Sequence, residues 1–361
     1  MKKLIIGTGI FMLIIIFLMV VVSCSSKGRT YSYEEIEQIL VQNTKKYYGY
    51  NKDLPAINQK MEISMTDLVN KGVIKSISEY TQDEITSCSA KVTIYNNNGY
   101  YLYVPSINCG DKYKSKTLYD TLINDNLTES GNGLYKVNNE YIFKGDNVNN
   151  YIKLGNALYR VISINDDGTI RIIERKRNNS NITTWDDRYN SEENRNYGIN
   201  NYYVNGLSSR LRDKIIEIYE GDTYSNEIKA YFVSKESCIG KRSINELENT
   251  GVYECSVKSD KYPISTIALY EYFRASLDTN CSGIENEACK NYNYFSDSLN
   301  NFWTITADKD STYRAFKIFS GSVELATVSN ITGINIVTTL TNDVLINNEG
   351  NGSLNNPYII K

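Results

Sequence analysis

Cysteine is the residue type whose placement says most about the chemistry of this chain. Seven cysteines are present, and one of them, Cys24, stands alone at the end of an apolar N-terminal run. The other six fall into neighbouring pairs: Cys88 with Cys109, Cys238 with Cys255, and Cys281 with Cys289. Zinc sites use tighter cysteine spacing and often histidine, so we expect disulfides formed in an oxidising compartment. Buried free thiols are the alternative, and neighbour pairing is a preference among many connectivities.

Cys24 ends a segment typical of membrane targeting, residues 1–24. Lys2 and Lys3 precede the apolar run Leu4–Val22, and Ser23 is the small residue that lipoprotein processing needs before a lipid-modified cysteine. About 19 residues at ~1.5 Å each give roughly 28 Å, so a single membrane-spanning helix is a second interpretation. A plain cleaved signal peptide is a third. Each places the body on the extracytoplasmic face of the membrane, which would be a partner through the N-terminus.

A loop near the last cysteine pair resembles a calcium-binding loop in its composition. Oxygen-bearing side chains alternate along it before and after Gly283. Cys289 stands where an EF-hand requires glutamate, so the loop is not an EF-hand, and a disulfide-closed polar loop is the alternative. Calcium is the one cofactor that the sequence suggests. Its candidate ligands are Asp278, Asn280, Ser282 and Glu285.

An aromatic residue beside charged ones marks a candidate ligand-binding site at Trp185, Asp186, Asp187 and Arg188. The ring face of a tryptophan next to acidic hydrogen-bonding groups can form a platform for a carbohydrate. In the alternative interpretation Trp185 belongs to the core, with its N–H satisfied, and one of the aspartates pairs with Arg188.

Composition excludes several classes of function. The chain has no histidine, which removes Ser-His-Asp and Cys-His catalysis and histidine-based zinc sites. It also lacks a G-x-S-x-G elbow, an S-x-x-K motif and a phosphate-binding P-loop. A net charge of −3 argues against a nucleic-acid partner. Carboxylates are plentiful, so a glycosidase that uses two of them stays open.

Residues 30–125 have the pattern of a small α+β domain. A capping box at Ser32–Glu35 precedes apolar residues at helical spacing, and a second short helix begins at Ser64 and ends near Gly72. Two strand-like runs, 91–95 and 100–104, flank an asparagine-rich turn that ends in glycine, which predicts a hairpin. The first cysteine pair lies just outside these strands.

Residues 135–361 read as a larger, β-rich domain after a polar boundary at 126–134. One amphipathic helix is expected over 207–218 with Asn205 as its cap, and a second helix, or a strand running into one, over 267–275. The expected strands are 141–143, 158–162, 169–173, 303–306, 316–319, 334–340 and 344–346, with a turn at 165–168.

Several segments in this order carry a resemblance. They are 157–165, 168–170, 185–190, 198–202, 271–278, 302–306 and 350–360. Together they resemble a group of uncharacterised surface proteins of Firmicutes. The C-terminal domain of that group is similar to the C-type-lectin-like fold of formylglycine-generating enzymes, and the N-terminal hairpin module is faintly similar to pilin heads. Residues 333–337 depart from the pattern, which has an Arg-Pro pair there, and no active-site cysteine pair can be carried over.

The sequence therefore predicts an α+β protein with an N-terminal anchor helix, a small helix-plus-hairpin domain and a β-rich C-type-lectin-like domain with two helices. We expect a membrane-anchored surface protein that is not an enzyme and binds a glycan or a protein. A pilus-like or envelope assembly component is the alternative, and a glycan-active enzyme that uses carboxylates is third.

Overall fold

A computed structural model describes residues 29–49, 53–82, 88–175, 181–204, 206–283, 287–296 and 301–361. The predicted anchor segment, with Cys24, lies outside these residues. None of the described helices is both long and apolar enough to cross a membrane. The α+β class predicted from the sequence is confirmed.

The chain divides into two compact units. The first takes residues from Met1–Lys52, Ile63–Val92 and Pro105–Lys114. The second takes Asp53–Glu62, Thr93–Val104 and Ser115–Lys361. This division runs through the predicted hairpin and gives residues 115–125, which the sequence groups with the first domain, to the second unit.

Helices in the first unit begin at serine caps. The side chain of Ser32 accepts a hydrogen bond from the Glu35 backbone N–H, and the Glu35 carboxylate accepts one from the Ser32 backbone N–H, so the predicted capping box is confirmed. Ser64 caps the next helix by accepting the Asp67 N–H with its side chain, and Gly72 follows the end of that helix with a φ of 66°. The helices are α2 (Tyr33–Tyr48), α3 (Met65–Asn70) and α4 (Ile77–Thr81), with the short 3-10 turn η1 (Gly110–Lys112).

The predicted hairpin is confirmed, and its sheet contains a third strand. Asn98 and Gly99 form its turn with φ values of 57° and 92°, the left-handed pair that a tight hairpin with a type I′ turn requires. The strand order is β1 (Lys60–Ser64), β2 (Ser89–Asn97) and β3 (Tyr100–Asn108).

Two sheets form the body of the second unit. In the larger sheet the order is β12-β17-β8-β7-β5-β4, with β6 also on β7 and β18 on β6. Its strands are β4 (Gly133–Val137), β5 (Glu140–Lys144), β6 (Tyr151–Leu154), β7 (Ala157–Ile164), β8 (Ile170–Glu174), β12 (Ile264–Ser265), β17 (Val337–Leu340) and β18 (Tyr358–Ile359).

The smaller sheet has the order β15-β14-β13-β16-β9. Its strands are β9 (Ile182–Thr184), β13 (Phe302–Ala307), β14 (Arg314–Phe319), β15 (Ser322–Thr327) and β16 (Ile331–Gly333). A short ladder of β10 (Tyr203–Val204) and β11 (Leu207–Ser208) stands apart.

The helices of the second unit correct one predicted boundary. The helix expected from residue 207 begins at Arg210, because Ser209 caps it, and Leu207 is an exposed residue of β11. The predicted cap Asn205 lies outside the described residues. The expected strand at 344–346 is reduced to isolated bridges at Leu345 and Ile346. The helices are α5 (Leu118–Asn126), α6 (Arg210–Glu220), α7 (Asn226–Lys229) and α8 (Leu269–Arg274), with 3-10 turns η2 (Glu254–Ser256) and η3 (Glu287–Lys290).

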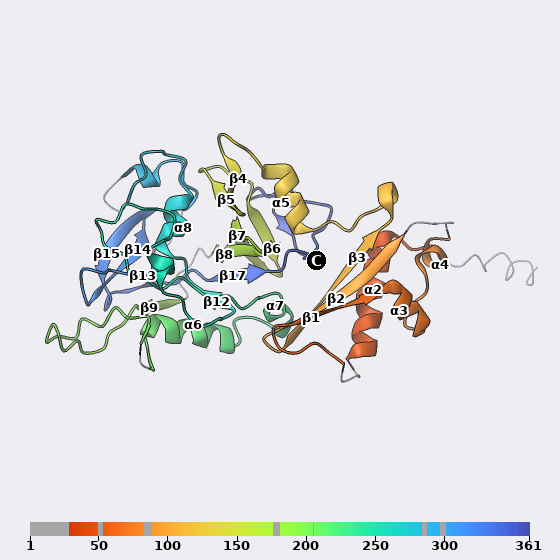
Figure 1. The fold of residues 1–361 in the computed structure, drawn as a ribbon, viewed down its shortest axis with the longest axis horizontal. Coiled ribbons are helices and arrows are strands. Elements are labelled where there is room, and N and C mark those ends of the chain that lie inside the picture. The colour runs from red at the N-terminus through yellow and green to blue at the C-terminus, as the bar shows by residue number, and fades with distance from the viewer. Residues whose placement is uncertain are drawn as a thin grey trace, which may run out of the picture. The chain divides into compact units, whose positions relative to one another are not determined.

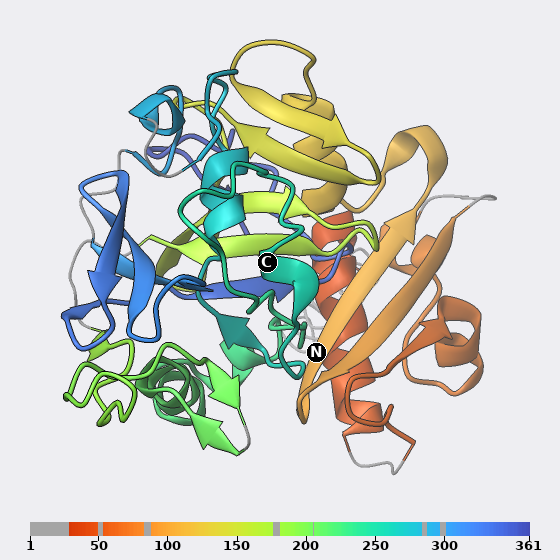
Figure 2. The ribbon, with the colours of Figure 1, turned by 60° about the vertical axis from the view of Figure 1, so that its left-hand side comes forward.

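Helix α8 lies between the two sheets of the second unit (Figures 1 and 2). Its buried residues, Leu269, Tyr272 and Phe273, belong to the apolar core, which also contains Trp185 and Trp303. Glu271 is buried as well, whereas Tyr270 and Arg274 are partly exposed. Residues of α8 line two pockets of the second unit.

Candidate ligand-binding site

Two adjoining pockets flank α8. The large pocket has a volume of about 840 Å³ and is bordered by the β4–β5 hairpin, residues 248–250, α8 and residues 276–281. The small pocket has a volume of about 500 Å³ and is bordered by the β7–β8 turn, residues 234–238 and residues 266–271. Both volumes are in the range of small-ligand sites. The residues that line both pockets are Glu140, Asp166, Cys255 and Tyr270.

Both ends of the α8 sequence are fixed by hydrogen bonds to the sheets. At its start, the Leu269 N–H donates to Thr306 Oγ1 of β13 at 2.9 Å. The Ala268 N–H donates to Glu271 Oε2 at 2.8 Å, which satisfies another free N–H of the first turn. After its end, the Gly145 N–H that follows β5 donates to the Ala275 carbonyl at 2.9 Å. The helix is therefore a rigid wall for both pockets.

Two charged residues on α8 tie it to the larger sheet. Glu271 is buried and forms a two-pronged ion pair with Arg171 of β8. Arg274 Nη2 donates to Glu140 Oε2 at 2.6 Å, which joins the helix to the first residue of β5. Tyr270, the residue before Glu271, lines both pockets.

Polar groups that have no hydrogen-bond partner among the described residues line the large pocket. The side-chain amides of Asn138 and Asn139, in the β4–β5 turn, make no hydrogen bond with any described residue. The hydroxyl of Tyr270 also has no hydrogen-bond partner in the described part of the chain. Burial, and next the charge of Glu271, raise the pKa of Tyr270, so its hydroxyl stays protonated. Such groups can both donate and accept hydrogen bonds with a ligand.

Lys144, the last residue of β5, brings a positive charge to the same pocket. Its ammonium lies 5.5 Å from the centre of the Tyr135 ring, and the side chain is half-buried. Burial and then the neighbouring Arg274 lower the pKa of Lys144 below its ordinary value. Within the described ranges Lys144 forms no ion pair.

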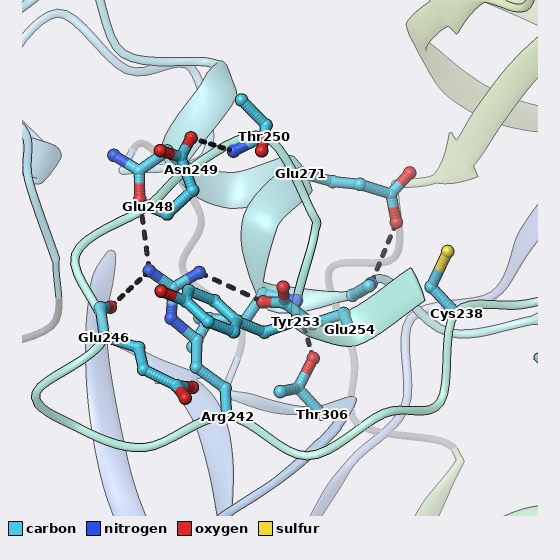
Figure 3. A network of polar contacts seen from close by, with 12 residues as sticks. Cys238, Arg242, Glu246, Glu248, Asn249, Thr250, Tyr253, Glu254, Glu271 and Thr306 are labelled. Carbon is cyan, nitrogen blue, oxygen red and sulfur yellow. Dashed lines mark hydrogen bonds and ion pairs between the residues drawn. The ribbon is translucent and has the colours of Figure 1, made fainter. Parts of the chain in front are cut away.

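A buried arginine holds the loop that closes the large pocket (Figure 3). The guanidinium of Arg242 is fully buried and donates to the Glu246 carbonyl at 2.6 Å and to Asn249 Oδ1 at 3.3 Å. Asn249 lines the pocket. Its Nδ2 donates a hydrogen bond to the Cys281 carbonyl at 2.8 Å, so the network extends to the segment that holds Cys281. Arg242 therefore positions a pocket wall without lining the pocket itself.

The counter-ion of Arg242 is Glu254, which is equally buried, at 3.2 Å. Burial raises the pKa of the Glu254 carboxyl, and the charge of Arg242 opposes that rise. Glu254 Oε2 and Arg242 Nε lack a hydrogen-bond partner among the described residues. Removing either partner would leave a buried charge unpaired and lower the stability of the fold, so we assign the pair a structural role and no ligand-binding role.

The structure corrects the candidate platform at Trp185. This side chain is fully buried, its Nε1 donates to the Thr304 carbonyl at 3.1 Å, and its ring has no face available to a ligand. Asp186 is also buried and pairs with Arg188, while Asp187 pairs with Arg210 on the surface. The core interpretation holds, since burying the ring removes more apolar surface from water than any other side chain in this segment.

The candidate calcium loop is only partly described, because Glu285 lies outside the described residues. Asp278 Oδ1 accepts a hydrogen bond from the Asn280 backbone at 2.9 Å, and its Oδ2 accepts one from Asn291 at 2.9 Å. The bond from Asn291 is the main cause of the lowered pKa of Asp278. Across the described ranges, no three acidic or cysteine side chains are grouped as a metal site.

All six paired cysteines form the disulfides that their spacing favours. The Cα atoms are 4.2 Å apart in Cys88–Cys109, 4.3 Å in Cys238–Cys255 and 4.4 Å in Cys281–Cys289. Cys255 and Cys281 line the pockets, so two of the bridges stabilise the pocket walls. Three disulfides are typical of a protein that folds in an oxidising, extracytoplasmic compartment.

Sequence reasoning missed the residues that line the large pocket. The strand before Asn138–Asn139 was not predicted, so this pair was not recognised as a hairpin turn, whereas Arg274 falls within the element predicted over 267–275. Nothing in the sequence indicated that residues more than a hundred positions apart share a pocket. No family model, curated protein or solved structure matches this chain, so the site is defined by its geometry.

Proposed function

We propose that this chain is an extracytoplasmic binding protein whose ligand is a glycan held in the large pocket. The observation that supports the proposal is that three polar side chains in this pocket have no hydrogen-bond partner among the described residues. They are Asn138, Asn139 and Tyr270. They line the same pocket as the partly exposed aromatic rings of Tyr135 and Tyr270. A sugar offers hydroxyls to such amides and apolar C–H faces to such rings, and few polar groups in a concave aromatic site are typical of ligand pockets.

The setting of the site supports the same proposal. Disulfides suit the outside of a cell, and the N-terminal segment with Cys24 is proposed as its anchor to the membrane, by lipid or by helix. The resemblance to surface proteins with a C-type-lectin-like domain agrees with a binding role. A protein ligand in the same pocket is the nearest variant of this proposal, and no nucleic-acid partner is expected.

The test is retention of the full-length chain, purified in mild detergent, on an array of cell-wall and mucin glycans. We expect specific retention that Tyr270→Phe weakens several-fold, because a hydrogen bond of about 0.5–1.5 kcal/mol is lost while the ring remains. Tyr292→Phe is the matched control, since the Tyr292 side chain is exposed and does not line either pocket. No retention of any glycan would exclude the proposal.

The same array distinguishes simple glycan binding from calcium-dependent binding and from glycan hydrolysis. Retention that a chelator abolishes and calcium restores would assign a cation to the Asp278 loop. Release of sugar reducing ends during incubation would instead indicate hydrolysis, for which Glu140 and Asp166, on the border of both pockets, are the carboxylates to replace. Assembly through α2 is disfavoured, because Ile36 and Leu40 are fully buried and offer no free apolar stripe.

A further inference from the structure

Lys144 is a partly desolvated cation without a counter-ion among the residues that the structure describes. Its ammonium lines the large pocket, near the ring of Tyr135, and makes neither a hydrogen bond nor an ion pair with any described residue. Arg274, which lines the same pocket, is already paired with Glu140. Removing a charge from water without a partner costs free energy, and an anionic ligand would recover it.

None of the acidic residues that line the pocket forms an ion pair with this lysine in the described part of the chain. Glu140 is engaged by Arg274, Glu248 Oε1 accepts the Thr250 N–H, and Asp278 accepts two hydrogen bonds. The lowered pKa of Lys144 agrees with this, because burial and the charge of Arg274 both lower the pKa and no carboxylate raises it. Lys144 is therefore a lining cation that has no carboxylate partner among the described residues. The lining carboxylates are Glu140, Asp166, Glu248 and Asp278.

Building on the proposed function, we infer that the glycan carries a carboxylate and that Lys144 binds it. The ligand is then an acidic sugar, of the uronic or sialic type, whose hydroxyls bond to Asn138, Asn139 and Tyr270. A single unpaired lysine matches a single negative charge. A phosphate or sulfate group, with more acceptor oxygens and often more charge, is better served by several donors or an arginine fork.

The experiment compares two acidic glycans with their own methyl esters on the full-length chain. Trigalacturonic acid and sialyllactose are titrated by calorimetry, each beside the ester that keeps every hydroxyl and removes the charge. We expect at least one acid to bind about tenfold or more tightly than its ester, the scale of one charge-assisted hydrogen bond. Lys144→Met should remove that preference, and Lys144→Arg should retain it.

Lys136→Met is the matched control, because Lys136 is an exposed lysine on the other strand of the same hairpin and does not line the pocket. Near-ultraviolet circular dichroism shows whether each variant is folded. If Lys144→Met does not fold, the comparison of acid with ester on the unaltered chain still tests whether binding depends on the negative charge of the ligand.

Equal affinity for acid and ester, or a preference that survives Lys144→Met, would overturn the inference and leave glycan binding intact. If no glycan binds, charged or neutral, the proposed function fails with it. A peptide with a free C-terminal carboxylate, and the same peptide amidated, complete the series. Binding of the free peptide alone would replace the acidic sugar by a protein ligand.

Discussion

Arg171 of β8 and Glu271 of α8 form an ion pair almost out of reach of water, with 15% and 4% of their side chains exposed. Two parallel contacts join them, one of which is Nη2 to Oε2 at 3.0 Å. Glu271 also accepts the Ala268 N–H at the start of α8. One carboxylate thus fixes both the helix start and its attachment to the larger sheet, which sets the position of Tyr270 and Arg274 in the pockets.

We expect Arg171→Met to lower the free energy of unfolding by about 3–5 kcal/mol, because it leaves the Glu271 charge buried without its partner. Lys214→Met is the control. Its pair with Glu217 is more exposed, at 28% and 68%, and should matter by less than about 0.5 kcal/mol. Urea unfolding followed by tryptophan fluorescence suits the measurement, because Trp185 and Trp303 both belong to the second unit. A loss under about 1 kcal/mol for Arg171→Met would contradict the buried-pair account.

Trp185→Phe should destabilise the second unit without changing ligand affinity. The Thr304 carbonyl loses its donor and the smaller ring leaves a cavity, so we expect a loss of about 1–3 kcal/mol. Trp303 remains as the fluorescent probe. Glycan retention, corrected for the folded fraction, should equal that of the unaltered chain. Lost retention with full stability would restore Trp185 as a ligand-binding residue.

The disulfide Cys281–Cys289 should contribute to stability and to the shape of the large pocket. It closes 8 residues, for which loop entropy gives about 2–3 kcal/mol on removal by serine at both positions. Non-reducing peptide mapping should recover all three bridges as linked peptides. Alkylation of Cys281 or Cys289 without prior reduction would refute this bridge, and alkylation of Cys88 or Cys109 would refute the hairpin bridge.

Lys144 should make stability depend on pH in the alkaline range. Its pKa is lowered in the folded protein, by burial first and Arg274 second, from an ordinary value of 10.5 in the unfolded chain. Between the two pKa values the unfolded chain holds more protons, so the free energy of unfolding rises with pH there. Below the folded pKa the cost of the buried charge is fully present. Lys144→Met removes this dependence.

The measurement is the difference in unfolding free energy between Lys144→Met and the unaltered chain, from urea curves taken at intervals from pH 7 to pH 10. Titrating tyrosines are common to both proteins and cancel in the difference. We expect any advantage of Lys144→Met at pH 7 to shrink as pH rises. A difference that stays constant across the series would show that Lys144 keeps its ordinary pKa.

Much of the local structure was determined by the sequence, because it depends on neighbours along the chain. Serine followed by glutamate three residues later satisfies the free N–H groups at the start of α2. Asn98–Gly99 supplies the left-handed backbone of the hairpin turn. Short-range cysteine pairing belongs with these features, since a bridge between near neighbours needs only a local turn.

The tertiary structure alone decided which residues meet at the pocket. Lys144 and Arg274 lie near each other only because β5 and α8 pack together through the Gly145–Ala275 hydrogen bond. Trp185 lies in a local sequence that suited a surface platform as well as a core. The tertiary structure buried it, and its Nε1 donates to the Thr304 carbonyl of β13. Local sequence fixes turns, caps and periodicity through short-range sterics and hydrogen bonds. Burial and charge pairing depend on long-range packing, which places residues far apart in the chain side by side.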